Sequence, residues 1–204
     1  MMIRLRLLLL PIAFLVVPFA FADEAEDLFN AGVEAADDGN HDEAAERWRE
    51  AARLDHADAA FRLGALYQEG RGVEQDDARA VEWFRRAADN DSESAWFNLG
   101  HMYARGQGVE KDAAEAVRWY EKAARNENAY AQYALGMIHF QGGPGVQPDM
   151  EATWFWLTVA ADNFGANAFR DNANDVRRQA EDRMNEEQRR AAGQRLRDWQ
   201  AEHE

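Results

Sequence analysis

Cysteine is absent from this sequence of 204 residues. The chain therefore has no disulfide framework, no thiolate nucleophile, no thiolate ligand for a metal ion and no N-terminal cysteine that could carry a lipid. Lysine is almost absent, since only Lys111 and Lys122 occur and arginine supplies the other basic side chains. Serine and threonine are also rare, and none lies in the Gly-x-Ser-x-Gly setting of a serine hydrolase.

Basic side chains as a whole are few compared with acidic ones. The 38 acidic side chains outnumber the 23 basic ones, and the formal net charge is -15. A surface of this sign repels phosphate backbones and anionic lipid headgroups. We therefore expect no nucleic acid among the partners of this protein.

The N-terminus has the pattern of a secretory signal. Arg4 and Arg6 form a short basic stretch, residues 7–19 are apolar, and Ala20-Phe21-Ala22 provides the small-x-small pattern of a signal peptidase site. We predict a cleavable signal peptide over residues 1–22, with Asp23 as the first mature residue. In a bacterial host, the protein would then be periplasmic or secreted.

An uncleaved membrane anchor is the alternative interpretation of the same segment. The apolar run is shorter than the roughly 20 residues that a spanning helix requires. Pro11 and Pro18 also interrupt it. We therefore favour cleavage, and expect no stable membrane insertion afterwards.

The most informative feature is an internal repeat with a 36-residue register. Three units share a Leu-Gly pair, an Asp, a Trp and an Ala-Ala pair, and the third has one extra loop residue. The recurring positions are Leu63-Gly64, Leu99-Gly100 and Leu135-Gly136; Asp76, Asp112 and Asp149; Trp83, Trp119 and Trp156; and Ala87-Ala88, Ala123-Ala124 and Ala160-Ala161. A shorter unit precedes them and places Trp48 in the Trp position.

Each unit is predicted to form two antiparallel helices. The glycine of the Leu-Gly pair removes a side chain where two helices approach closely, and the Gly-x-Gly-Val segment breaks the helix. The recurring Asp stands where an N-cap satisfies free amide groups of the second helix. Asn40 with Glu43, and Asp112 with Glu115, have the spacing of a capping box.

These positions together resemble the Sel-one-like repeat, a relative of the tetratricopeptide repeat. The resemblance implies an all-α fold, a right-handed α-solenoid of stacked antiparallel helix pairs closed by C-terminal capping helices. The implied organisation is four repeats in residues 23–165, at about 25–58, 59–94, 95–130 and 131–165, followed by the cap at 166–204. The last helix is expected to begin at Asn185 and to carry Ala192, Leu196 and Trp199.

Nothing in the sequence indicates an enzyme, a cofactor or a metal site. The Gly-x-Gly loops follow no strand and lack the Gly-Lys ending of a phosphate-binding loop. The five histidines form no metal-binding pair, and His139 occupies a tyrosine position of the repeat, which favours a packing role. Some bacterial relatives act on penicillin-type compounds, but they are cysteine-rich, so we do not extend that activity to this chain.

The predicted signal peptide and the resemblance together imply an exported protein-interaction module, an adaptor or regulator, that binds a protein or peptide on its concave face. In such solenoids the first helix of each pair lines that face. The predicted partner-binding residues are Phe29, Phe61, Gln68, Phe97, His101, Arg105, Tyr133, Met137 and Gln141.

Several alternatives remain open. The aromatic row of Phe29, Phe61, Phe97 and Tyr133 could serve repeat packing, and His101 could be an ordinary surface histidine. The protein could instead be a cell-envelope hydrolase, although no nucleophile with a positioned base is visible. It could also be a structural factor that self-associates through its charge polarity, whereas we expect a monomer.

Overall fold

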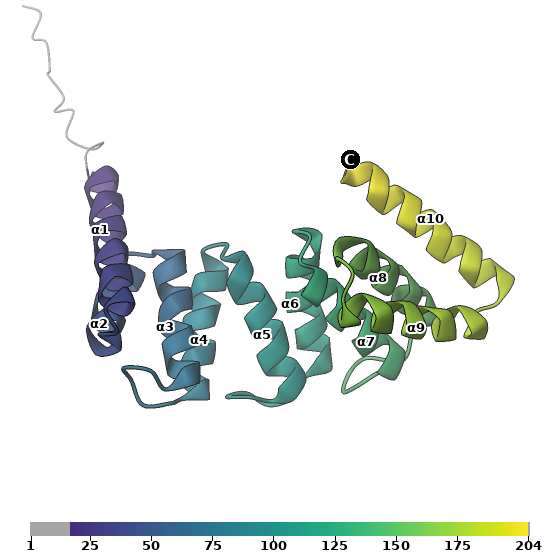
Figure 1. Ribbon diagram of the computed structural model, residues 1–204, viewed down its shortest axis with the longest axis horizontal. Coiled ribbons are helices and arrows are strands. Elements are labelled where there is room, and N and C mark those ends of the chain that lie inside the picture. The colour runs from purple at the N-terminus through teal and green to yellow at the C-terminus, as the bar shows by residue number, and fades with distance from the viewer. Residues whose placement is uncertain (1–16, 204) are drawn as a thin grey trace, which may run out of the picture.

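The computed structural model describes residues 17–203 as a row of α-helices (Figure 1). Over this range the chain forms ten helices, and its β-structure is limited to one isolated bridge between Gly143 and Val146. The helices are α1 (Val17–Asp37), α2 (His41–Arg53), α3 (Ala57–Glu69), α4 (Asp77–Asp89), α5 (Glu93–Arg105), α6 (Ala113–Arg125), α7 (Ala129–Gln141), α8 (Met150–Asn163), α9 (Ala168–Arg183) and α10 (Glu186–Glu202). The prediction of an all-α solenoid is confirmed.

The first eight helices form four successive pairs, α1/α2, α3/α4, α5/α6 and α7/α8, which we number as repeats one to four, and each pair packs on the next. The Ala-Ala pairs of the second helices are buried, so little side-chain volume separates a second helix from the following first helix. One buried cluster extends from α1 to α5, a second joins α6 to α7 and α8, and a third lies between α8 and α9.

Within a pair, the glycine of the Leu-Gly motif leaves a space that a large side chain from the second helix fills. A Cβ atom added at Gly64 would lie 2.8 Å from the ring of Phe84, and one at Gly100 would lie 2.6 Å from the ring of Tyr120. Gly32 meets the indole of Trp48 in the same way. These contacts correct one part of the sequence alignment: Trp48 occupies the position of Phe84, not the position of Trp83, because the residue that fills the glycine notch precedes the Ala-Ala pair by three positions.

The second glycine of the Gly-x-Gly-Val loops has its own structural role. Gly72 and Gly108 have φ values of 67° and 66°, in the left-handed region that favours glycine. A Cβ at Gly72 would overlap with the backbone of His41, and one at Gly108 would overlap with the carbonyl group of Asp77. Each loop thus lies directly against the N-terminus of the preceding second helix, and the glycine makes that close approach possible.

The predicted Asp N-caps are present, but the two predicted capping boxes are not. The carboxylates of Asp76, Asp112 and Asp149 each accept a hydrogen bond of 3.0 Å from the amide three residues later. Asn40 makes no side-chain cap, and the return half of the box at Asp112 is also missing.

The glutamates explain why these boxes fail. Glu43 and Glu115 pair instead with Arg47 and Arg118, one helical turn further along. The box that forms is at the start of α10, where the side chains of Asn185 and Gln188 each accept from the backbone amide of the other residue.

The C-terminal segment consists of two helices that pack on different sides of α8. Helix α9 packs on α8 and touches α7. Helix α10 turns back across α8, as Figure 1 shows. Leu196 and Trp199 of α10 pack against the cluster that contains Tyr120 and Trp156.

The predicted signal peptide falls mostly outside the described residues. Residues 1–16 lie beyond the described part, and residues 17–22 belong to the beginning of α1. None of the described helices is long and apolar enough to cross a membrane.

Candidate functional site

The candidate site is the face formed by the first helices α1, α3, α5 and α7, which we call the first-helix face. Phe29, Phe61 and Phe97 occupy the same position in three successive first helices and are all half-buried. The ring of Phe61 packs on Phe84 at a centroid distance of 5.6 Å, and that of Phe97 packs on Tyr120 at 5.7 Å. The rings of Phe61 and Phe97 therefore take part in repeat packing, but each ring also has part of its surface exposed.

Phe29 differs from the other two rings in its partner. It stacks on the imidazole of His56 with a centroid distance of 4.5 Å and an interplanar angle of 17°. His56 is the N-cap of α3, and its Nε2 lies 3.2 Å from the Glu26 carboxylate. The stacking of Phe29 on His56 therefore fixes the first ring of the row and links α1 to the start of α3.

His101 and Arg105 continue the stripe of Phe97 along α5, one and two helical turns further on. Burial lowers the pKa of His101, and the neighbouring Arg105 guanidinium lowers it further. His101 is consequently neutral around pH 7. Arg105 is exposed, and no carboxylate of the described residues lies within ion-pair distance of its guanidinium.

The structure places Tyr133 and Met137 against α9. The Tyr133 hydroxyl donates a hydrogen bond of 2.6 Å to Oδ1 of Asn172, and Met137 packs with the cluster that includes Ala173 and Val176. Two of the predicted groove residues therefore contact the C-terminal cap of the same chain. The sequence assigned 166–204 to a cap but contained no signal of which side α9 would cover.

The two predicted glutamines lie near the ends of their helices. Gln68 is half-buried on α3, and its backbone carbonyl accepts a hydrogen bond of 3.1 Å from the Gln75 side chain. Gln141 is the exposed last residue of α7. Both lie one turn or more beyond the aromatic row.

Tyr130, Phe164 and Phe169 were missed by the sequence prediction. Tyr130 precedes Tyr133 by three residues on α7, so it belongs to the same stripe of the first-helix face. Its ring lies 6.4 Å from that of Phe97 and 5.3 Å from that of Phe169. The helical spacing could have indicated Tyr130, but only the packing of α9 brings Phe169 beside it.

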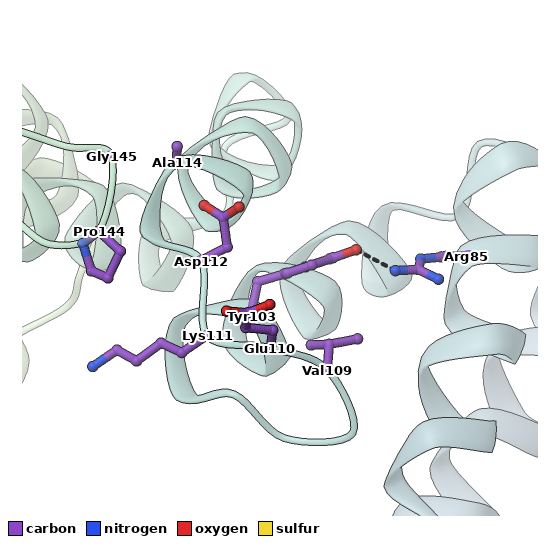
Figure 2. Close-up of a pocket in the computed structure, with 9 residues that line it drawn as sticks. All are labelled: Arg85, Tyr103, Val109, Glu110, Lys111, Asp112, Ala114, Pro144 and Gly145. Carbon is purple, nitrogen blue, oxygen red and sulfur yellow. Dashed lines mark hydrogen bonds between the residues drawn. The ribbon is translucent and has the colours of Figure 1, made fainter.

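A surface pocket of about 610 Å³ lies at the junction of the second, third and fourth repeats, near the interhelical loops (Figure 2). In Figure 2, Tyr103 of α5 extends toward Arg85 of α4, which donates a hydrogen bond to the tyrosine hydroxyl. A smaller pocket occurs one repeat earlier, lined by Tyr67 and the loop before α4. Because the pocket recurs with the repeat, its shape follows from the loop geometry.

Part of the polar lining of the junction pocket has a structural role. Its aspartate, Asp112, is used as the N-cap of α6. It contains no serine, threonine or histidine. Among the described residues, no group of three or more histidine, aspartate or glutamate side chains is arranged to hold a metal ion.

A sequence profile of the Sel1 repeat matches residues 57–92, 94–128 and 129–163, which together are just over half of the chain. The chain belongs to the Sel1 repeat family. Sel1 repeat proteins are generally protein-interaction modules that bind protein partners, and the fold is typically a non-enzymatic scaffold.

Solved structures of Sel1 repeat proteins resemble the chain over most of its length. A Sel1 repeat protein from Oxalobacter formigenes is 29% identical with a TM-score of 0.62, and the match covers 79% of this chain and 75% of the other. The protective antigen c5321 of uropathogenic Escherichia coli strains, described as displaying an SLR fold, is 25% identical with a TM-score of 0.53. That match covers 89% of this chain but 48% of the antigen. A search of curated proteins found no match.

Proposed function

We propose that this protein is an exported adaptor or regulator that binds a protein or peptide segment on its first-helix face. The observation that carries the proposal is the row of half-exposed rings at one position of successive first helices: Phe29, Phe61 and Phe97. Rigid aromatic side chains provide a large contact area at a low entropic cost, and such residues are enriched among binding hot spots. Tyr130 extends this row with a more exposed ring.

The surroundings of the aromatic row support a binding role in addition to a packing role. The core beneath these rings is complete, because Leu63 and Leu99 of the same helices are fully buried. His101 and Arg105 lie beside the row without a role in the core. A polar pair of this kind next to an aromatic surface is suited to select a partner.

Site-directed photo-crosslinking in the native host tests the binding face. A photoreactive amino acid at position 97 or 105 should give an adduct with one partner of defined mass. The same amino acid at the exposed position 118 on α6 should give none. Adducts from position 118 alone would contradict the proposal, and adducts with the mass of two copies of the chain would favour self-assembly.

Export has a separate test. The protein is isolated from the envelope and from the medium of the native host, and its N-terminus is sequenced. We expect the chain to begin at Asp23, because Ala20-Phe21-Ala22 precedes that residue. Recovery in the cytoplasm with residues 1–22 intact would contradict this part of the proposal.

A further inference from the structure

A pocket of about 460 Å³ lies between α10 and the second helices α6 and α8, and we call it the α10 pocket. It is separate from the first-helix face, because no residue of a first helix lines it. Three aromatic rings, two arginines and three carboxylates contribute to its lining. Sites for small molecules commonly have volumes of about 300–1,000 Å³, so this pocket is large enough for such a ligand.

The aromatic part of the α10 pocket is held in place by packing. Phe155 and Trp156 are 1% and 3% exposed, and Trp199 of α10 packs on both of their rings. Trp199 itself is only half-buried, and His203 stacks on it at a centroid distance of 3.9 Å. An aromatic ligand that enters the pocket would therefore meet an ordered surface, so that little side-chain entropy would be lost on binding.

Arg195 of α10 provides a positioned positive charge. Its Cζ atom lies over the ring of Phe155, 4.1 Å from the centroid, and 5.6 Å from the centroid of Trp156. The side chain remains accessible to solvent, and no carboxylate of residues 17–203 lies within ion-pair distance of its guanidinium. A guanidinium that stacks on an aromatic ring keeps its N–H groups available for a carboxylate. Arg195 can therefore receive an anionic group from outside the chain.

The carboxylates of the α10 pocket also lack a basic partner. Glu121 is half-buried on α6, Glu202 is exposed at the end of α10, and Asp198 accepts a hydrogen bond of 2.7 Å from the neutral amide of Gln194. No basic side chain in the described part of the chain lies within ion-pair distance of any of the three carboxylates. The pocket thus presents unpaired charges of both signs. A ligand that carries both charges matches this lining better than a simple anion or cation, which would meet like charges.

We propose that the α10 pocket binds an aromatic amino acid in its zwitterionic form. The ligand carboxylate pairs with Arg195, its ammonium group pairs with Glu121, and its aromatic side chain packs against Trp199 and His203. A guanidinium binds a carboxylate through two parallel hydrogen bonds, which fixes geometry as well as charge. This site is additional to the proposed function, since the protein or peptide partner is assigned to the first-helix face.

NMR titration of residues 23–204 with three ligands tests the proposal. L-Phenylalanine carries both charges, N-acetyl-L-phenylalanine lacks the ammonium group, and L-phenylalaninamide lacks the carboxylate. We expect L-phenylalanine to shift the indole signal of Trp199 and to bind at least about tenfold more tightly than either analogue, because each analogue loses one charge-assisted contact.

Two substitutions assign the charged contacts. Arg195→Gln should abolish the preference for L-phenylalanine over its amide, and Glu121→Gln should abolish the preference over the N-acetyl analogue. Arg197→Gln is the matched control on α10, because Arg197 is exposed and lies outside the lining of the pocket. This control should retain the affinities of the unsubstituted chain for all three ligands.

Three results would each overturn the proposal: no shift of the Trp199 signal with L-phenylalanine, equal affinities for the three ligands, or unchanged preferences in Arg195→Gln. The ligand comparison needs no variant, and the ligand-free spectra verify that each variant is folded. Photo-crosslinking from position 97 does not involve the α10 pocket, so failure here is distinguishable from failure of the proposed function.

Discussion

The guanidinium of Arg49 donates a hydrogen bond of 3.4 Å to the hydroxyl of Tyr67, which belongs to the next repeat. The same pair recurs 36 residues later, where Arg85 donates to Tyr103. At the third junction both partners change: Glu121 stands in the arginine position and His139 in the tyrosine position. The last junction therefore has a different chemistry from the first two.

Introducing the arginine–tyrosine pair at the third junction should stabilise the protein relative to the single substitutions. In a double-mutant cycle with Glu121→Arg and His139→Tyr, we expect a favourable coupling of about 0.5–1.5 kcal/mol, the usual net value of one hydrogen bond. Urea unfolding of the four proteins measures it. A coupling of zero would mean that the two positions do not meet across the junction.

The stability of the protein should depend on pH through His139. Burial is the largest cause that lowers the pKa of this imidazole below its ordinary value of 6.5, so the unfolded chain binds the proton more readily than the folded one. At pH values above the pKa of the unfolded chain, the imidazole is neutral in both states and has no effect on stability. As the pH falls below 6.5, protonation of the imidazole favours the unfolded chain, so the fold loses stability.

Substitution His139→Tyr removes that group, so the loss of stability between about pH 7.5 and about pH 5 should be smaller in this variant. Urea midpoints at the two pH values measure the difference. His203→Asn, at the exposed end of α10, is the control and should retain the loss seen in the wild type. An unchanged pH dependence in His139→Tyr would show that other groups dominate it.

Gly108→Ala should destabilise the protein more than Gly39→Ala does. Both glycines have a positive φ, 66° and 82°, so alanine pays a similar backbone cost of about 1 kcal/mol at either position. Only at Gly108 would the added methyl group overlap with the carbonyl of Asp77, whereas nothing lies within 4 Å at Gly39. We expect an additional loss of about 2 kcal/mol or more from this overlap.

Thermal or urea unfolding of the two variants compares these costs directly. Equal losses at the two positions would mean that the loop moves away from α4 easily. In that case the glycine would serve only the turn, and the close approach of loop and helix would not be a requirement of the repeat.

Trp199 should hold α10 on the solenoid. Its ring lies 5.8 Å from Phe155 and 5.4 Å from Trp156, in both cases near an edge-to-face arrangement. Trp199→Ala removes these contacts and should cost about 2–3 kcal/mol, somewhat less than for a fully buried tryptophan. Arg197→Ala, on the exposed side of the same helix, should cost less than about 0.5 kcal/mol.

Hydrogen exchange of the α10 amides measures this local stability. Faster exchange confined to α10 in Trp199→Ala is the expected pattern. Equal protection of α10 in both variants would contradict the anchoring role.

Much of this fold was predictable because the same residue pattern, with the same packing role, recurs in successive repeats. The Leu-Gly pairs, the Ala-Ala pairs and the Asp N-caps each recur at 36 or 37 residues, and each fixes a local contact that the structure contains. The capping boxes at Asn40 and Asp112 were wrong because nearby arginines compete for the same glutamates. Spacing alone does not rank such competitors.

The sequence by itself determined the helix pairs, their order and the residues of their core, because these depend on periodicity and on contacts between neighbours along the chain. The tertiary structure decided where the C-terminal cap lies. Helix α9 covers Tyr133 and Met137, and it brings Phe169 beside Tyr130 from 39 residues away. That contact joins segments without a shared repeat position, so only the packing of α9 on α8 could bring the rings of Tyr130, Phe164 and Phe169 together.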